Sequence, residues 1–317
     1  MSYSKSTGVF ESTDKKHKIF YTICVPEAVP RGIVQISHGM CEYFGRYERE
    51  GFVGRLTDAG YIVCGNDHIG HGFTAENKKG LGFFEDYNVL ADDIGRMKDI
   101  VKEKYRSLPY FIFGHSMGSF VARTYISKHD DIDGCILSGT TAGNQPLGLG
   151  IGLVKFLSKI HGDHYISKAA VGMSFAGYNK KFKSEKASFS WGSSDPDVRK
   201  RYAEDPRCNY FFTVTGYREM FKMIKFISDD KWALSVPKSL PVLLISGEDD
   251  PLGDYGKGIA EVKERLEDAE LCSIEMKLVE KGRHEPFNDF CRDEFFGYVI
   301  PWLDEKVSGA VAARTGA

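Results

Sequence analysis

Several features that define whole classes of protein are missing from this sequence of 317 residues. No stretch of 18 apolar residues occurs, so we expect no transmembrane helix. Lysine and arginine form no block or stripe and the formal net charge is -2, which argues against a nucleic-acid partner. Residues 1–20 contain no apolar run of the kind found in a secretory signal, so the expected location is cytoplasmic.

The spacing of cysteine and histidine argues against metal and redox sites. The seven cysteines are widely spaced and none belongs to a Cys-x-x-Cys pair, as zinc knuckles and redox motifs require. Several lie inside apolar runs, where cysteine acts as a small hydrophobic residue. His68 and His71 lie three apart in a DHIGHG turn, but two histidines without a third ligand make a poor metal site. We therefore expect no metal ion and no cofactor.

Short apolar runs alternate with helical patterns along most of the chain. Six such runs occur, and most of them are rich in Val, Ile and Leu without clean alternation, as expected of strands buried on both faces: 32–39, 61–67, 110–116, 134–140, 241–247 and 274–280. Helical patterns occupy 86–105, 257–268 and 289–306. The alternation predicts an α/β fold with a mostly parallel central sheet flanked by helices. Residues 18–27 are expected to add an antiparallel edge strand.

The strand–helix alternation stops after Thr141 and resumes near Pro237. Residues 141–236 contain several helical stretches, no convincing buried strand, and too many residues for a plain loop. We predict that they form an inserted, mainly helical cap. Residues 1–140 and 237–317 would then make up the α/β core.

One helical pattern in the predicted cap, at 149–160, has a clear apolar stripe. The stripe consists of Leu149, Leu153, Phe156, Leu157 and Ile160. Packing of this stripe on the core is favoured over docking on a membrane surface. Peripheral membrane contact through the cap stays open as the alternative.

Residues 114–118 form a Gly-x-Ser-x-Gly motif with Ser116 at its centre. The motif follows an apolar strand and opens a helical pattern, which is the context that a nucleophile elbow requires. In such an elbow the serine occupies a sharp strand-to-helix turn, and the flanking glycines allow close backbone approach. Ser116 is therefore the predicted nucleophile, with a purely structural turn serine as the alternative.

A serine hydroxyl needs a base to remove its proton and an acid to orient that base. In a fold with this elbow, the acid and then the histidine follow the serine along the chain. His284 is the only histidine in the last third of the sequence, so it is the predicted base. Three aspartates compete for the role of acid, and spacing does not separate Asp249, Asp250 and Asp254.

A tetrahedral intermediate also needs two donors aimed at its oxyanion, and these are usually backbone N–H groups. Met117 directly follows the nucleophile and is the first predicted donor. His38-Gly39-Met40 follows an apolar strand and resembles the oxyanion loop of lipases. That resemblance implies the Met40 N–H as the second donor.

Four blocks of sequence resemble the monoacylglycerol lipase and lysophospholipase branch of the α/β hydrolases, which are similar to serine aminopeptidases. The blocks are 37–47, 66–74, 114–119 and the pair 246–254 with 282–285. The resemblance implies the α/β-hydrolase fold, and its Gly-x-x-Asp segment implies Asp250 as the acid of a Ser-His-Asp triad. Two residues depart from the family pattern, since Cys41 and Ser119 stand where glycine is common.

The resemblance implies a small amphiphilic ester as the substrate, such as a monoacylglycerol or lysophospholipid, cleaved through an acyl-enzyme. Aromatic and methionine side chains of the cap fit an acyl tunnel: Phe175, Phe182, Phe211, Phe212, Met220, Phe221, Met223 and Phe226. The sequence does not specify which cap residues contact the substrate, the acyl length or the oligomeric state.

Other substrates and other functions are consistent with parts of the pattern. An aryl or cinnamoyl ester, a thioester or an N-terminal peptide bond are alternatives, because the cap offers acidic residues that could hold an α-amine. A hydrolase-fold receptor without turnover agrees less well with a complete set of catalytic residues. A dehalogenase or epoxide hydrolase would need aspartate at position 116.

Overall fold

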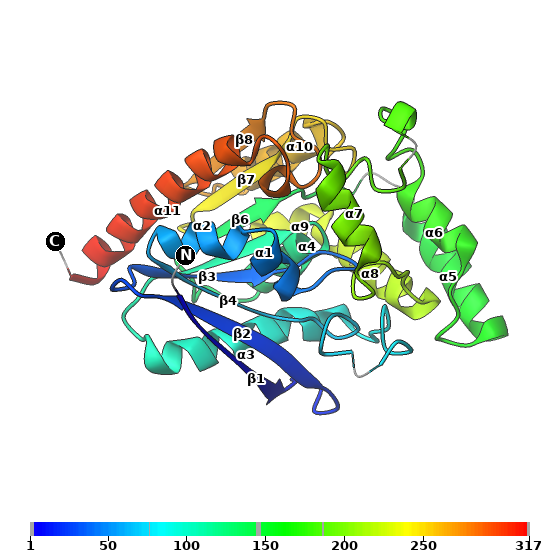
Figure 1. Cartoon of the computed structure of the whole chain (residues 1–317), viewed down its shortest axis with the longest axis horizontal. Helices are drawn as coiled ribbons and strands as arrows, with labels where there is room; N and C mark the ends of the chain where they lie inside the picture. Colours follow the sequence, from blue (N-terminus) through cyan, green and yellow to red (C-terminus); the bar gives the residue numbers. More distant parts are fainter. Residues whose placement is uncertain (1–2, 76, 144–146, 186, 316–317) are drawn as a thin grey trace.

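The computed structural model describes residues 3–75, 77–143, 147–185 and 187–315. Its strands form one eight-stranded sheet in the order β1-β2-β4-β3-β5-β6-β7-β8 (Figure 1). Their bounds are β1 (Tyr3–Glu11), β2 (Lys18–Pro26), β3 (Gly32–Ser37), β4 (Tyr61–Asn66), β5 (Tyr110–His115), β6 (Gly134–Ser138), β7 (Val242–Gly247) and β8 (Ile274–Val279).

The strands β3 to β8 are parallel to one another and correspond to the six predicted runs. The strand predicted at 18–27 is antiparallel, but the prediction of an edge position is wrong. β2 lies between β4 and a further antiparallel strand, β1, which forms the edge. β1 escaped prediction because Phe10 is its only buried residue, so it lacks the apolar pattern of a half-buried strand.

Helices cover both faces of this sheet because side chains of successive strand residues point to opposite sides. Val34 and Phe111 pack against one set of helices: α1 (Phe44–Arg49), α2 (Phe52–Asp58) and α11 (Arg292–Thr315). Ile33 and Ile112 pack against the other set: α3 (Tyr87–Lys104), α4 (Met117–Ile126) and α10 (Lys257–Asp268). The predicted fold class is confirmed.

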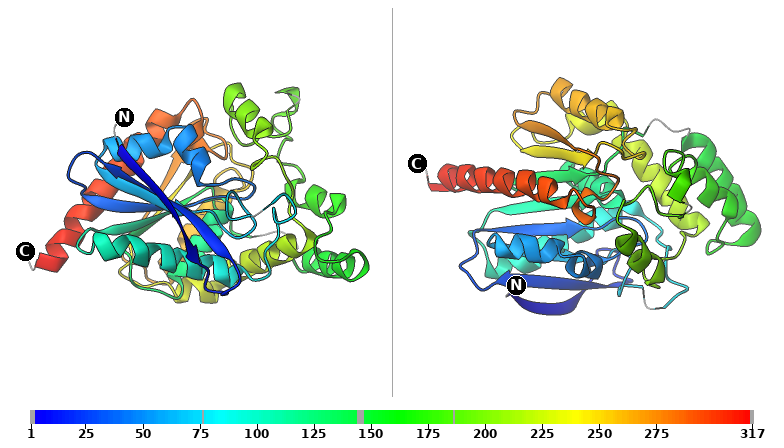
Figure 2. Two further views of the ribbon diagram at one scale, coloured as in Figure 1. Left: turned by 60° about the horizontal axis from the view of Figure 1, so that its bottom comes forward. Right: turned by 45° about the horizontal axis from the view of Figure 1, so that its top comes forward.

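Between β6 and β7 the chain forms helices and, in the described residues, no strand. The helices are α5 (Leu147–His161), α6 (Lys168–Phe175), the 3-10 helix η1 (Lys183–Glu185), α7 (Pro196–Glu204), α8 (Val214–Ile227) and α9 (Asp230–Leu234). α5 and α6 lie at the end of the molecule opposite the C-terminus of α11 (Figures 1 and 2).

Parts of the predicted domains fall outside the described residues. These parts are 144–146 and 186 of the predicted cap, and 1–2, 76 and 316–317 of the predicted core. Within the described ranges, no helix combines the length and the apolar character needed to cross a bilayer.

The apolar stripe predicted on α5 is not the face that the helix buries. α5 buries Gly150 and Val154 instead, while Leu149, Phe156 and Ile160 are exposed. The reason lies in the small size of Gly150, which allows Phe221 of α8 to approach its backbone closely. The expectation that the stripe packs on the core is therefore wrong for these three residues.

Candidate active site

The turn between β5 and α4 has the geometry of a nucleophile elbow. Ser116 adopts φ 52° and ψ -123°, a left-handed backbone conformation that side chains rarely occupy. Its N–H donates to the Ser138 carbonyl at 2.9 Å. A Cβ atom on Gly118 would lie 1.9 Å from the Ser37 carbonyl oxygen, so only glycine lets α4 pass so close to β3.

His284 follows β8, and Asp250 follows β7. The ring Nδ1 of His284 pairs with Asp250 Oδ2 at 2.9 Å, and both side chains are buried. Asp250 also accepts hydrogen bonds from the Ser246 hydroxyl at 2.8 Å and from the Leu252 N–H at 2.9 Å. This carboxylate is therefore held in place by three donors.

The other two aspartates of this loop lie in different surroundings. Asp249 pairs with Lys181 of the insertion, and its side chain is partly exposed. Asp254 is exposed, in a left-handed turn with φ 47°. Of the three carboxylates that the sequence left open, the structure brings Asp250 to His284.

Two buried histidines lie side by side next to Ser116, and their electrostatic surroundings differ. Burial lowers the pKa of His284, but the charge and hydrogen bond of Asp250, together with the charges of Glu285 and Glu42, outweigh burial and raise this pKa above its ordinary value. The ring of His115 lies 4.7 Å away, and burial together with His284 holds the pKa of His115 well below its usual range. His284 is therefore the better proton acceptor near neutral pH.

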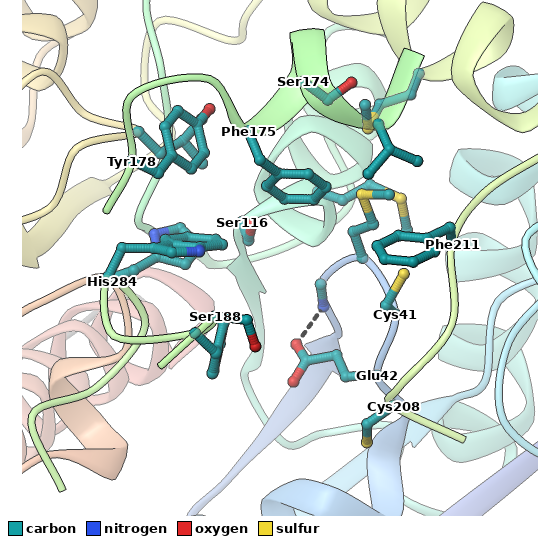
Figure 3. A pocket seen from close by; sticks show the side chains of 18 of the residues that line it. Cys41, Glu42, Ser116, Ser174, Phe175, Tyr178, Ser188, Cys208, Phe211 and His284 are labelled. Carbon is teal, nitrogen blue, oxygen red and sulfur yellow. Dashed lines mark hydrogen bonds between the residues drawn. The ribbon is translucent and has the colours of Figure 1, made fainter. Parts of the chain in front are cut away.

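The second ring nitrogen of His284 is not used by Asp250, which pairs with Nδ1. His284 Nε2 is buried and has no hydrogen-bond partner within the described ranges. Ser116 and His284 lie at the wall of the same cavity (Figure 3). An unpartnered ring nitrogen in the same cavity as a serine hydroxyl is compatible with proton transfer, since catalytic hydrogen bonds often form or tighten only with substrate bound.

The two predicted oxyanion donors belong to the same cavity as Ser116. Met40 and Met117 line the cavity with Ser116, and in the described chain neither backbone N–H donates a hydrogen bond. The Gly39 N–H, in contrast, donates to Glu42 Oε1 at 2.5 Å (dashed in Figure 3). Cys41 adopts φ 56° in the same loop, a conformation that explains why glycine is common at this position.

A buried ion-pair network, which the sequence reasoning missed, connects this loop to the segment after the histidine. Arg46 donates to Glu42 Oε2 at 2.7 Å and to both carboxylate oxygens of Glu285, at 2.6 and 2.5 Å. The Tyr47 hydroxyl adds a bond to Glu42 at 2.7 Å. The signal was present in the sequence, because Glu42 and Arg46 are spaced i,i+4 and Glu285 directly follows His284.

A cavity of about 650 Å³ opens at Ser116. Its mostly apolar walls come from the core and from the insertion. The insertion contributes most of them: Leu147, Val171, Met173, Phe175, Trp191, Tyr210, Phe211, Met220, Phe221 and Ile224. Of the eight cap residues proposed for an acyl tunnel, Phe175, Phe211, Met220 and Phe221 line the cavity.

His68 and His71 lie under the oxyanion loop, together with His38. The ring of His38 lies 4.3 Å from that of His68 and 5.1 Å from that of His71. His38 Nε2 accepts the His68 N–H at 3.0 Å, and His71 Nδ1 pairs with the Ile69 carbonyl at 3.0 Å. These contacts tie the turn to the loop.

Residues 28–290 match the family model described as serine aminopeptidase, S33. The chain belongs to this family of α/β hydrolases. Within the family it is similar to lipases that act on monoglycerides. At the level of enzyme class it is a carboxylic-ester hydrolase.

Relatives differ in how much of their own length they share with this chain. A monoacylglycerol lipase of Mycolicibacterium smegmatis is 27% identical over 237 residues, which cover 74% of this chain and 76% of that protein. An uncharacterized abhydrolase domain-containing protein of Dictyostelium discoideum is 24% identical over 94% of this chain, but the match spans only 29% of that protein.

Among solved structures, a thermostable carboxyl esterase from Bacillus coagulans in complex with glycerol is similar over its whole length. It superposes with a TM-score of 0.89 at 30% identity, covering 96% of this chain and 100% of the esterase.

Proposed function

We propose that this carboxylic-ester hydrolase removes a single acyl chain from a monoacylglycerol or lysophospholipid. The observation that carries the proposal is the mostly apolar cavity of about 650 Å³ that opens at Ser116. Burial of each methylene of an acyl chain in such a cavity contributes about 0.8 kcal/mol. Residues 141–236 would act as the cap that walls this channel. The similar monoacylglycerol lipase, and the similar esterase that was solved in complex with glycerol, support the choice of alcohol.

In the proposed mechanism, His284 Nε2 takes the proton of Ser116 as the serine oxygen attacks the ester carbonyl. The Met40 and Met117 N–H groups stabilise the oxyanion, and Asp250 orients the imidazole and stabilises its charged form. The tetrahedral intermediate collapses to an acyl-enzyme, and His284 passes its proton to the departing alcohol. A water molecule, deprotonated by His284, then releases the fatty acid and restores Ser116.

An aminopeptidase activity is the alternative that the family description suggests, and the cavity argues against it. A peptidase needs a free carboxylate to hold the α-ammonium group of its substrate. Among the described residues that line the cavity, the acidic ones are Glu42 and Glu285, and both form ion pairs with Arg46. Arg46, the Gly39 N–H and the Tyr47 hydroxyl already occupy these two carboxylates, so neither is free to hold an ammonium group, although two carboxylates with one arginine keep a net charge of -1.

The exposed apolar side of α5 supports peripheral contact with a lipid surface. Leu149, Phe156 and Ile160 are 76%, 60% and 57% exposed, beside the helices that wall the cavity. Such residues gain free energy when they enter the interfacial region of a bilayer. Co-sedimentation with phosphatidylcholine vesicles should weaken in Phe156→Ser, and equal binding of the variant and the parent protein would reject this contact.

The proposed substrate class is tested with graded substrates on the purified enzyme. Monoacylglycerols, lysophosphatidylcholines and p-nitrophenyl esters from acetyl to palmitoyl would be compared with aminoacyl-p-nitroanilides. We expect kcat/KM for esters to rise with chain length and to level off when the cavity is full. Preference for the anilides, or rates indifferent to length from acetyl to lauroyl, would reject the proposal.

A further inference from the structure

A buried arginine on the nucleophile helix contacts both ends of the insertion. Arg123 lies in α4, two turns after Ser116, and is fully buried. Its Nη1 donates to the Thr141 carbonyl at 2.8 Å and to the Thr140 hydroxyl at 3.3 Å. Its Nη2 donates to the Ile227 carbonyl at 2.5 Å.

The side chain of Trp232 completes this contact. The guanidinium carbon lies 4.0 Å from the centre of the Trp232 ring, and the indole N–H donates to the Arg123 carbonyl at 2.8 Å. A planar, five-donor guanidinium can bind two separated carbonyls and stack on an indole, which a lysine ammonium cannot do.

These partners are the places where the chain enters and leaves the insertion. Thr140 and Thr141 follow β6, where the insertion begins. Ile227 is the last residue of α8, and Trp232 lies in α9 shortly before the chain returns to the sheet. One side chain of the core therefore fixes both crossings of the insertion.

Keeping a positive charge at this position has a free-energy cost. Within the described chain, no carboxylate forms an ion pair with Arg123, and burial together with Arg265 lowers its pKa to about 9. The Ile227 carbonyl at the end of α8 compensates in part, because a helix C-terminus carries partial negative charge. Arg265 itself donates to the Ala142 carbonyl at 3.1 Å, so two arginines bind successive carbonyls at the first crossing.

The helix held by Arg123 forms one wall of the cavity. α8 packs against α4 and places Met220, Phe221 and Ile224 in the cavity lining. A shift of the C-terminal end of α8 would therefore widen or narrow the cavity beside α8, without altering the elbow that carries Ser116.

We propose that Arg123 is a positioning residue that sets the place of α8 over Ser116 and, through α8, the selectivity of the enzyme for acyl-chain length. The inference rests on the proposed function, because it takes the cavity to be the acyl channel. Arg123 does not touch the substrate. It acts through the two crossings of the insertion.

The test compares p-nitrophenyl decanoate with p-nitrophenyl acetate in Arg123→Lys and Arg123→Met. If α8 walls the acyl channel, a decanoyl chain contacts it, whereas an acetyl group has no methylene chain with which to make that contact. We expect kcat/KM for the decanoate to fall about tenfold, the equivalent of losing contact with roughly two methylenes, and the acetate to change little. Circular dichroism at the assay temperature establishes that each variant is folded.

Lys98→Met is the matched control, because Lys98 is also a buried cation but pairs with Asp131, away from both crossings. A merely structural role for Arg123 predicts that all variants lose stability and keep the decanoate-to-acetate ratio of the parent enzyme. If the Arg123 variants do not fold, Trp232→Leu removes one contact of the same arginine and should lower the ratio in the same direction.

Two results would overturn the inference, and they can be told apart from failure of the proposed function. A folded Arg123 or Trp232 variant with the parent ratio would contradict the positioning role. An equal loss on both esters would place the effect at the reacting groups instead of the channel. If the parent enzyme itself shows no gain from acetate to decanoate, the acyl channel and the proposed function fail first.

Discussion

Asp250 holds its position through three hydrogen bonds, and each of them comes from a different element of its surroundings: His284, Ser246 and the Leu252 N–H. Asp249, its neighbour, points instead toward Lys181. The two side chains are therefore a natural pair of variants for testing which carboxylate assists the base.

Asp250→Asn should lower kcat by about 10⁴, because asparagine favours the wrong tautomer of His284. Asp249→Asn should change kcat by less than about tenfold, since Asp249 has only a partly exposed ion pair to lose. Steady-state hydrolysis of p-nitrophenyl butyrate measures both. A larger loss in the Asp249 variant would mean that the acid has been assigned to the wrong residue.

The pH dependence of activity follows from the same contact. His284 accepts a proton only when neutral, and Asp250 raises the pKa of His284 above its ordinary value of 6.5. Activity should therefore be lost as the pH falls through this raised pKa. In Asp250→Asn the remaining activity should persist to lower pH, because the charge that favoured the imidazolium is gone.

The profile of kcat/KM from about pH 5 to 9 on a neutral ester gives the measurement. An acid limb that stays in the same place in Asp250→Asn would show that Asp250 does not control the protonation of His284.

Individual residues of the candidate site were predictable to different degrees. Ser116 and His284 follow from a motif and from the absence of rival histidines. Spacing could not separate Asp250 from Asp249, because these neighbours have almost the same position along the chain. They differ in the direction of their side chains, which only the folded loop determines. The partners Arg46 and Glu285 are 239 residues apart, and only the folded chain brings such a pair together.

At the scale of elements, two glycines with opposite surroundings test the packing of the nucleophile helix. Gly118→Ala should destabilise the protein by about 3 kcal/mol or more, because the new Cβ would lie 1.9 Å from the Ser37 carbonyl oxygen. Gly152→Ala, in α5, should raise stability by up to about 1 kcal/mol, since nothing lies within 4 Å of its Cβ position.

Thermal unfolding of both variants measures these effects. A Gly118→Ala protein as stable as its parent would show that α4 does not pass as close to β3 as the structure has it. Because no atom lies near the Cβ position of Gly152, its variant also serves as a control for a glycine-to-alanine substitution without a clash.

Elements were predictable where burial made their apolar pattern strong. The strands β3 to β7 are buried along their whole length and appear in the sequence as apolar runs. β8 was also predicted as a strand, but it is buried only at Val279 and otherwise partly exposed. β1 is exposed along most of its length, so its pairing with β2 depends on backbone hydrogen bonds that leave no apolar signal. On α5 the apolar stripe was visible, but close packing at Gly150 decided which face is buried.

For the whole molecule, the order of the motifs along the chain was enough to predict the fold class. The fold brings together at one end of the sheet the loops after β3, β5, β7 and β8, which carry Met40, Ser116, Asp250 and His284. An apolar channel under the insertion was predicted, and four of the eight residues proposed for it line the cavity. The remaining wall residues could not be predicted, because they come from helices of the insertion whose mutual packing has no simple sequence pattern. Of all parts of the proposed function, the substrate class therefore depends most on the structure.

Covalent labelling shows most directly whether Ser116 is the nucleophile. A fluorophosphonate probe should label the parent enzyme once, at Ser116, as read by intact mass and peptide mapping. Ser116→Ala should bind no probe and should lose monoacylglycerol hydrolysis by roughly 10⁶, with its fold intact by circular dichroism. Probe attached to any other serine, or substantial turnover by the folded Ser116→Ala protein, would contradict the account.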